Sequence, residues 1–438
     1  MKYFGTDGIR QKADQFTPEF LYKIARGLVD YAGDTVKVLI GGDTRESSEW
    51  IIRDLESAFE NLGVEYQTID VLPTPGINYC FYQMGFDFAV DVTASHNPYT
   101  DNGIKIFERG ETSGTKLCEA GCEKIEESLE KELFYDAVSA SARENLHDDA
   151  LDLYKSHLET YLGEADFKGL KIGMDCANGA TSVVNKSIFE KLGANVKLIN
   201  ADAEFGTGIN HDCGSTHLEK LQELVKNNQL DFGVAFDGDG DRCLLVNHEG
   251  EVVDGDEIIA ILANYLKLDK IAITVMANQG LLNWAKDNKV HAEITAVGDS
   301  NVAAAMREQD IKIGGEQSGH IILPGEATGD GMLTALMITK VVAETKKSLK
   351  DLSSIMTKFP QIIVNMDATP DQKKALKEKD EAKNLLLEFN QKLDSVEGRL
   401  LVRPSGTENL IRITMWGNDS EAIEKLANEL KTKLGEVL

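Results

Sequence analysis

Positive charge is scarce in this chain of 438 residues. It has 46 lysines and arginines against 73 aspartates and glutamates, a formal net charge of −27. A surface of that sign repels the phosphate backbone of nucleic acids and the anionic face of a membrane, so we expect neither as a partner. We also expect no membrane span and no secretory signal, because no apolar run approaches the roughly 18 residues that a span needs.

Cysteine is scarce as well. The six cysteines are scattered, and Cys118 and Cys122 have no second pair with which to complete a zinc site. We therefore expect buried or idle thiols in a reducing compartment. These absences together predict a cytoplasmic protein that binds neither nucleic acid nor a membrane. For its partners, we expect a small-molecule substrate and either a monomer or a homodimer.

The sequence does contain a regular alternation of short β-rich runs and longer helical stretches, which is typical of α/β domains. Most of the runs lead into a loop of Gly, Asp, Asn, Ser or Thr, and ligands bind to such loops at the carboxyl ends of strands. The expected strands are Val36–Ile40, Phe86–Val92, Leu170–Met174, Phe232–Phe236, Ile271–Val275 and Ile311–Ile313. The expected helices between them include Glu49–Leu62, Thr181–Leu192, His217–Asn227 and Glu257–Leu266.

The chain is too long for a single core. Turn and helix-breaking residues predict four domains, at 1–150, 151–250, 251–357 and 358–438. An acidic helical stretch, 119–166, crosses the first boundary. The last domain has a different pattern, with expected helices and an antiparallel strand pair at Lys373–Leu393, Arg399–Val402, Leu410–Met415 and Ser420–Leu434.

The acidic loop after the fourth expected strand is the first candidate site. Asp237, Asp239 and Asp241 alternate with glycines, so their carboxylates converge on one point and require a compensating cation. Few, hard oxygen ligands favour Mg²⁺ that also binds a phosphate. A phosphatase of the haloacid-dehalogenase type, with Asp237 as nucleophile, remains an alternative of lower rank, because that class typically has Thr or Val at position 241.

The second candidate site follows the strand that ends at Val92. A serine at a strand end beside a histidine, here Ser95 and His96, indicates nucleophilic chemistry. No Gly-x-Ser-x-Gly elbow surrounds Ser95, so an acyl-transfer triad is not supported. A capped turn with an ordinary hydrogen-bonded histidine explains this segment equally well. Lys105 is either a general acid or base or a surface cation.

Three further loops offer groups for a phosphorylated sugar. Arg403 and Arg412 flank a glycine-bearing loop with two hydroxyls, a compact cradle for an anion. The loop that holds Glu316 and Ser318 offers donors and acceptors for sugar hydroxyls or an amine, and a polar turn is its equally plausible alternative. At the start of the chain, Arg10 follows a tight turn.

Taken in order, the segments FGTDGIR, TASHNPYTDNGIKIF, DGDGDR, GEQSGH and RPSGTENLIRI closely resemble the α-D-phosphohexomutase family, nearly from end to end. The resemblance implies three related α/β domains with mixed sheets and a smaller α+β C-terminal domain, around a central cleft. The GEQSGH form favours the branch that interconverts glucosamine 6-phosphate and glucosamine 1-phosphate. The branches that act on glucose or mannose phosphates are the alternative, since Ser300 stands where the first branch commonly has Arg.

The resemblance also implies residue roles. Ser95 would carry a phosphoryl group, Mg²⁺ would bind Asp237, Asp239, Asp241 and a phosphate oxygen on Ser95, and a hexose 1,6-bisphosphate would be the intermediate and activator. Arg10, His96, Lys105 and Arg242 would line the centre of phosphoryl transfer, with Lys105 as the best general acid or base. Glu316 and Ser318 would hold the sugar hydroxyls. The distal phosphate would lie on Arg403, Ser405, Gly406, Thr407 and Arg412.

Overall fold

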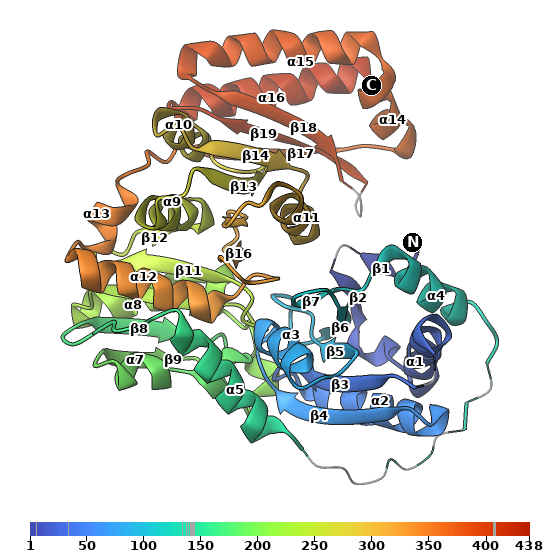
Figure 1. Cartoon of the computed structure of the whole chain (residues 1–438). Coiled ribbons are helices and arrows are strands. Elements are labelled where there is room, and N and C mark those ends of the chain that lie inside the picture. Colours follow the sequence, from blue (N-terminus) through green and yellow to red (C-terminus); the bar gives the residue numbers. More distant parts are fainter. Residues whose placement is uncertain are drawn as a thin grey trace. The chain divides into compact units, whose positions relative to one another are not determined.

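The computed structural model describes residues 1–5, 7–33, 35–133, 135, 136, 138, 140, 145–405 and 409–438 (Figure 1). They form two compact units. The first unit contains residues 1–274 and 293–353, and the second contains residues 275–292 and 354–438. Among the described residues, no helix is long and apolar enough to span a membrane.

The first sheet of the larger unit is mixed, with the order β1-β2-β6-β5-β3-β4 and β7 beside β6. Its centre is parallel, because β3 pairs in parallel with both β4 and β5, whereas β6 runs antiparallel to β5. The strands are β1 (Phe4–Gly5), β2 (Gly8–Lys12), β3 (Lys37–Gly42), β4 (Glu65–Val71), β5 (Phe88–Val92), β6 (Asp101–Arg109) and β7 (Gly114–Lys116). The helices are α1 (Pro18–Ala32), α2 (Glu46–Leu62), α3 (Thr74–Gln83) and α4 (Glu119–Leu129).

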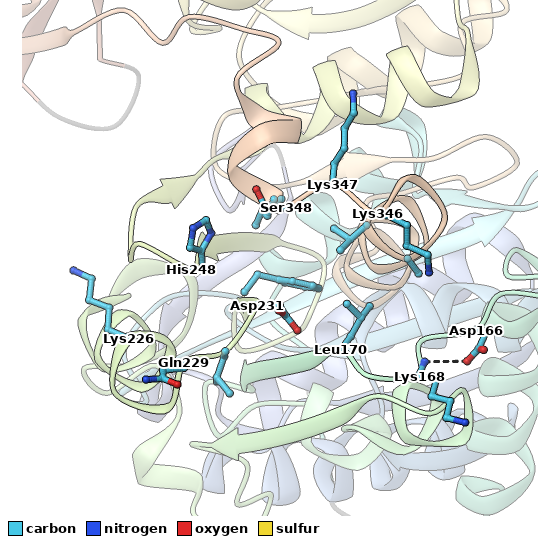
Figure 2. Close-up of a pocket in the computed structure, with 15 residues that line it drawn as sticks. Asp166, Lys168, Leu170, Lys226, Gln229, Asp231, His248, Lys346, Lys347 and Ser348 are labelled. Carbon is cyan, nitrogen blue, oxygen red and sulfur yellow. Dashed lines mark hydrogen bonds between the residues drawn. The ribbon is translucent and has the colours of Figure 1, made fainter.

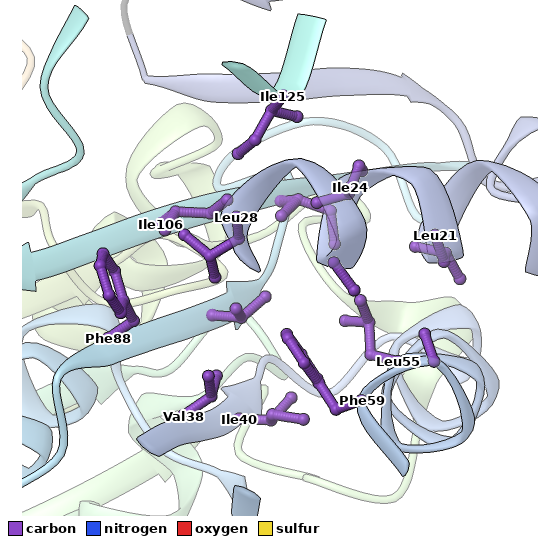
Figure 3. Packing of buried hydrophobic residues seen from close by; sticks show 14 of the residues in the cluster. Leu21, Ile24, Leu28, Val38, Ile40, Leu55, Phe59, Phe88, Ile106 and Ile125 are labelled. Carbon is purple, nitrogen blue, oxygen red and sulfur yellow. The ribbon is translucent and has the colours of Figure 1, made fainter. Parts of the chain in front are cut away.

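The core of this domain lies between the sheet and helices α1, α2 and α4. Helix α1 begins where the Thr17 side chain accepts a hydrogen bond from Phe20 N and Pro18 takes the first turn. Its apolar face, with Leu21, Ile24 and Leu28, packs on the strands (Figure 3). The same cluster includes Leu55 and Phe59 from α2 and Val38, Ile40 and Ile106 from the strands. A closed core of this kind holds the strand ends, and therefore the loops that follow them, in fixed positions.

The second sheet has the order β12-β11-β10-β8-β9, with β8 parallel to β9 and β10 and a hairpin from β10 to β11. Its strands are β8 (Lys171–Asp175), β9 (Asn195–Ile199), β10 (Phe232–Phe236), β11 (Cys243–Asn247) and β12 (Val252–Val253). Its helices are α5 (His147–Thr160), α6 (Thr181–Val184), α7 (Ser187–Lys191) and α8 (Glu219–Asn228). The single helix expected over Thr181–Leu192 is wrong, because Asn185 takes a positive φ of 41° and divides it into α6 and α7.

The third sheet is short. Strand β13 (Lys270–Thr274) is parallel to β15 (Gly314–Gly315), which pairs antiparallel with β16 (Ile321–Ile322). The strand expected at Ile311–Ile313 is wrong, since the paired residues are the two glycines that follow it. The helices are α9 (Gly255–Leu266), α11 (Asp299–Gln309), α12 (Gly331–Thr345) and α13 (Leu349–Ser353), and the chain crosses between the two units along β14 (His291–Thr295).

The smaller unit contains an antiparallel sheet of order β17-β19-β18. The expected pairing of its last two strands is confirmed, with Arg403 opposite Arg412. The expected helix over Lys373–Leu393 is two helices, because Lys379 is extended and separates them. The elements are α10 (Gln279–Asp287), β17 (Gln361–Asp367), α14 (Pro370–Glu378), α15 (Asp380–Leu393), β18 (Arg399–Pro404), β19 (Leu410–Trp416) and α16 (Ser420–Val437).

Candidate active site

Ser95 lies in the loop after β5, in a left-handed conformation with φ of 53° and a fully buried side chain. The guanidinium of Arg45 holds this loop. Its Nη2 donates to the carbonyl oxygens of Ser95 and Asn97 at 2.9 and 2.8 Å, and its Nη1 donates to those of Pro98 and Asp101 at 2.6 and 3.1 Å. Because Arg45 is itself 2% exposed, these contacts fix the backbone on which the Ser95 hydroxyl is mounted.

Arg45 is fixed in turn by an ion pair with the buried carboxylate of Asp43, at 2.9 Å. The amide of Asn210, from the second sheet's domain, donates to the carbonyl oxygen of Ser95 at 2.8 Å. The strained serine is thus held from two domains of the larger unit. Strain of this kind persists where the surroundings determine the conformation, which is common at functional sites.

Asp237, Asp239 and Asp241 follow β10, and the hairpin to β11 turns their carboxylates to one point. One oxygen from each lies within 4.8 Å of the others, and all three residues are buried. The Ser95 hydroxyl donates to Asp237 Oδ2 at 2.9 Å, so the structure brings the two candidate loops together. Oδ1 atoms of Asp239 and Asp241 are buried without a hydrogen-bond partner among the described residues. Unshared, hard oxygen ligands in this arrangement fit a divalent cation such as Mg²⁺.

Lys105 lies on β6 and points into the same cluster. Its Nζ lies 2.7 Å from Asp239, 3.0 Å from Asp241 and 3.1 Å from Asp7. Burial by itself would lower the pKa of this ammonium, but the three carboxylates outweigh burial and raise the pKa well above its ordinary value. Lys105 is therefore charged in this arrangement and neutralises part of the acidic cluster.

The contacts of Lys105 belong to a closed ring of charged and polar groups. Asp7 also binds Lys116, which binds Asp299. His320 completes the ring, with Nε2 at 3.8 Å from Asp299 and Nδ1 at 3.6 Å from Asp241. Burial raises the pKa of Asp7, but Lys105, Lys116 and Arg10 outweigh burial and hold it below its ordinary value. The ring connects the third sheet's domain to the centre that contains Ser95 and the three aspartates.

A cavity of about 220 Å³ borders this ring, and Asp7, Lys105, Lys116 and Ser300 are among the residues that line it. Ser300 stands where one branch of the family commonly has Arg, and it brings no charge to this cavity. Lys116 lines the same cavity and supplies a cation there.

His96 and two arginines surround the Ser95 hydroxyl. Nδ1 of His96 lies 3.2 Å from Ser95 Oγ. Burial first, and the nearby Arg242 and Arg10 second, lower the pKa of His96 to about 4, so its imidazole is neutral at pH 7. The backbone N–H of Arg242 donates to Asp237 Oδ1 at 3.2 Å, and Nη2 of Arg10 pairs with Asp7 at 2.5 Å. The centre therefore has two guanidinium groups near a neutral base, one paired with Asp7 and the other with Nε at 3.7 Å from Asp237 Oδ2.

The loop between β15 and β16 carries Glu316 and Ser318. An isolated bridge pairs Arg242 with His320, which places this loop beside the acidic hairpin. Oε1 of Glu316 accepts a hydrogen bond from Gly298 N at 3.2 Å, and Ser318 is exposed. The structure therefore brings this loop close to the acidic site.

The candidate anion cradle belongs to the smaller unit. Arg403 and Arg412 face each other on β18 and β19, and burial together with Arg412 lowers the pKa of Arg403. Ser405 is 6% exposed, and its N–H donates to Leu410 O at 2.9 Å. Gly406 and Thr407 lie outside the described residues. Two like charges held side by side on a strand pair suit a ligand with more than one negative charge.

Arg45, Asp7 and Lys116 are site residues that no sequence motif assigned. Arg45 closes the loop GGDTR after β3, the same kind of loop after a strand that carries Ser95 and Asp237, so its position was a usable signal. Asp7 lies inside the segment FGTDGIR, although only Arg10 was assigned a role there. Lys116 lies in no motif, and its contacts with Asp7 and Asp299 depend on the packing of two domains.

The cysteines take no part in the site. All six are free, and five of them are buried, as expected. Cys118 is exposed and begins α4. None of the described residues forms a cysteine cluster for a metal, since the three aspartates are the only candidate group among the residues that the structure describes.

Comparison with known proteins gives four consecutive matches to the phosphoglucomutase/phosphomannomutase family. Its α/β/α domains I, II and III match residues 1–136, 152–250 and 254–359, and its C-terminal domain matches residues 340–433. The chain is 42% identical to a phosphoglucosamine mutase from Caldicellulosiruptor bescii, with 98% of each chain covered. It is 39% identical to one from Clostridioides difficile, with 100% of this chain and 99% of the other covered.

Solved structures agree on the fold. A phosphoglucomutase/phosphomannomutase family protein from Burkholderia thailandensis superposes with a TM-score of 0.78 at 19% identity, over 99% of this chain and 97% of that one. The N-acetylphosphoglucosamine mutase of Aspergillus fumigatus, solved with GlcNAc-6P and magnesium, gives a TM-score of 0.67 at 16% identity, over 98% and 95% of the two chains. Four domain matches, full-length relatives at about two-fifths identity and this shared fold lead to one conclusion. The chain belongs to the phosphoglucomutase/phosphomannomutase family, the α-D-phosphohexomutases.

Proposed function

We propose that this phosphohexomutase interconverts glucosamine 6-phosphate and glucosamine 1-phosphate, through a phosphoryl group carried on Ser95 and a bound 1,6-bisphosphate. Relatives named phosphoglucosamine mutase at 37–42% identity support the choice of sugar. The observation that carries the chemistry is the contact of Ser95 Oγ with Asp237 Oδ2 at 2.9 Å, inside a buried cluster of three carboxylates. The product would feed the synthesis of UDP-N-acetylglucosamine in the cytoplasm.

Phosphoryl transfer depends on positioning and charge compensation more than on covalent help. The Arg45 clamp positions Ser95, so a phosphate on its Oγ would be directed at the carboxylate cluster, where Asp237, Asp239 and Asp241 would hold Mg²⁺. Bound there, Mg²⁺ would neutralise charge on the phosphate oxygens and on the aspartates that now keep Lys105 protonated. The guanidinium groups of Arg10 and Arg242, which both lie near His96, would stabilise the transferring group.

Two groups are placed to move protons. Lys105 would exchange a proton with the attacking or leaving sugar hydroxyl, and its contact with Asp7 at 3.1 Å gives the ammonium a partner when it leaves the aspartates. His96 is neutral at pH 7, with Nδ1 at 3.2 Å from Ser95 Oγ, so it can accept a proton from the Ser95 hydroxyl or return it. In the half-reaction that returns a phosphoryl group to Ser95, neutral His96 would accept the hydroxyl proton and charged Lys105 would donate a proton to the leaving sugar oxygen. The half-reaction that phosphorylates the sugar would move both protons in the opposite direction, starting from neutral Lys105 and protonated His96.

The remaining assignments concern recognition of the substrate. Glu316 and Ser318 would bind sugar hydroxyls or the amine, and a carboxylate is a suitable partner for the ammonium of glucosamine. Arg403, Ser405, Gly406, Thr407 and Arg412 would hold the phosphate that is not being transferred. Because the bisphosphate presents either phosphate in turn, this cradle must accept both ends of the intermediate.

Turnover of the three hexose 6-phosphates tests the proposed substrate. With Mg²⁺ and the matching bisphosphate, we expect kcat/KM for glucosamine 6-phosphate to exceed those for glucose and mannose 6-phosphate. Equal or better turnover of mannose 6-phosphate would place the enzyme in the other branch. Ser95→Ala should abolish turnover with every sugar, whereas Ser113→Ala, a change at another serine of domain I, should not. Release of free phosphate with retained activity in Ser95→Ala would instead support a phosphatase that uses Asp237.

A further inference from the structure

A second pocket lies away from the site described above, at the opposite end of the same sheet. It has a volume of about 620 Å³, within the range of small-molecule sites. Leu170 precedes β8, Asp231 precedes β10 and Phe232 begins β10, so the pocket opens at the amino ends of these strands. Asp237 follows the carboxyl end of β10. It lies about 16 Å from Phe232, because a strand advances about 3.3 Å for each of the five residues. None of the aspartates of the candidate active site lines it.

The floor of this pocket is apolar. Leu230, Phe232, Val342 and Leu349 line it with 0–6% of their surface exposed. The backbone groups around the floor are already bonded, since Asp231 N donates to Lys171 O at 2.8 Å and Leu230 N to Val225 O at 3.0 Å. A ligand would therefore meet the floor through apolar contact and not through backbone hydrogen bonds.

The rim of the pocket is cationic. Lysines 168, 226, 346 and 347 line it, and Figure 2 shows their side chains around its margin, with Leu170 between them. None of these four lysines has an ion-pair partner among the described residues, whereas Lys350, just beyond the pocket, is paired with Glu249. In a chain with a net charge of −27, a cluster of unpaired lysines is a local reversal of charge.

The two carboxylates on the rim offset only part of this charge, because four lysines line the pocket against two aspartates. Asp231 Oδ2 accepts a hydrogen bond from Lys171 N at 2.7 Å, and Asp166 Oδ1 accepts one from Lys168 N at 2.9 Å, the dashed line in Figure 2. Each is therefore engaged by a backbone donor. The imidazole of His248 and the Ser348 side chain lie together on another side of the rim, where they add polar contacts (Figure 2).

The geometry points to a second ligand site in this pocket, for a small organic anion with an apolar or aromatic body and a phosphate, sulfonate or carboxylate group. The body would contact the floor made by Leu230, Phe232, Val342 and Leu349. The anionic group would lie at the rim, where lysine ammonium groups attract an anion without requiring one fixed geometry. Lysine also shields the apolar surface with its methylene chain until a ligand arrives.

The test uses two fluorescent probes that differ in one charged group, 1-anilinonaphthalene-8-sulfonate and the neutral N-phenyl-1-naphthylamine. The full-length protein should bind the sulfonate at one saturable site, more tightly than the neutral probe, with an affinity that falls as NaCl is added. In the double variant Lys226→Glu/Lys346→Glu, binding of the sulfonate should weaken about tenfold or more, while binding of the neutral probe should change little. Glucosamine 6-phosphate at saturation should not displace the sulfonate.

Lys267→Glu is the matched control. Lys346 ends α12 and Lys267 ends α9, both in the left-handed conformation, with φ of 58° and 56°. Both substitutions therefore place a carboxylate at a helix carboxyl end, but only Lys346 lines the pocket. Unchanged sulfonate affinity in the double variant, an equal loss in Lys267→Glu, or displacement of the sulfonate by glucosamine 6-phosphate would each overturn the proposal.

Discussion

Replacement of Lys105 by methionine should make Mg²⁺ bind more tightly to the three aspartates, although it removes a residue of the proposed centre of phosphoryl transfer. The ammonium of Lys105 is 3% exposed and contacts Asp239 and Asp241 at 2.7 and 3.0 Å. A divalent cation on these aspartates therefore competes with an ammonium that is already bound to them. Methionine keeps most of the apolar stem and removes the competitor.

The contacts set the size of the effect. A hydrogen bond to a charged group contributes about 1.5–3 kcal/mol, so release of the two contacts to the aspartates costs about 3 kcal/mol at the lower end. The remaining contact of Lys105 with Asp7, at 3.1 Å, recovers part of that cost. If half is recovered, about 1.5 kcal/mol remains, which corresponds to a Kd for Mg²⁺ that is slightly more than tenfold lower in Lys105→Met. The metal-free variant should also be less stable by about 3–5 kcal/mol, because two buried carboxylates lose their cation.

Isothermal titration of metal-free protein with MgCl₂ measures the Kd directly. Lys116→Met is the matched control, because Lys116 belongs to the same ring but binds Asp7 and Asp299 and none of the three clustered aspartates. Its Mg²⁺ affinity should stay close to that of the wild type. A second readout is thermal unfolding, in which saturating Mg²⁺ should stabilise Lys105→Met more than the wild type. Mg²⁺ affinity in Lys105→Met equal to or weaker than that of the wild type would refute this account of the cluster.

Two further predictions concern stability. Arg45→Lys should lower the free energy of unfolding by about 3–5 kcal/mol, since an ammonium cannot reproduce the buried fork of contacts, and it should speed hydrogen exchange in the loop around Ser95; wild-type exchange rates would contradict the clamp. Asp330 is buried at the start of α12 and accepts a hydrogen bond from Tyr154 at 2.9 Å, and burial first, then Glu326, raises its pKa from 3.8 to about 7. Between these two values the unfolded state loses a proton that the folded state keeps, so this group costs stability as pH rises from about 4 to 7. Asp330→Asn retains the cap and removes that cost, so its stability relative to the wild type, measured by urea unfolding, should increase by about 2.5 kcal/mol between pH 5 and pH 7.5. A difference that does not change with pH would contradict the assignment.

Much of the site could be predicted from the sequence because its chemistry lies in loops directly after apolar strands. Val92 and Phe236 end buried strands, so the side chains that follow them had to lie at a sheet edge. That Ser95 Oγ would meet Asp237 was implied by the resemblance to the phosphohexomutases, because two separate domains supply the two atoms.

The expected helices and the expected strand that were wrong also have physical explanations. The breaks at Asn185 and Lys379 interrupt segments with a continuous helical pattern, and backbone conformation at a single residue decides such breaks. The strand at Gly314–Gly315 has little strand propensity of its own and exists because β13 and β16 pair with it. Arg45 was not assigned a role although its loop follows a strand, because most of its partners are backbone carbonyl oxygens, which no residue type in the sequence reveals.

The central claim is that Ser95 carries the phosphoryl group between the two positions of one sugar. The most direct measurement incubates the protein with Mg²⁺ and glucosamine 1,6-bisphosphate, maps the phosphorylated peptide by mass spectrometry, and then adds glucosamine 6-phosphate. We predict one phosphoryl group on Ser95, absent in Ser95→Ala, whose loss on addition of the sugar phosphate matches the bisphosphate formed. A phosphoryl group on Asp237, or turnover of glucosamine 6-phosphate by Ser95→Ala at the wild-type rate, would contradict the account.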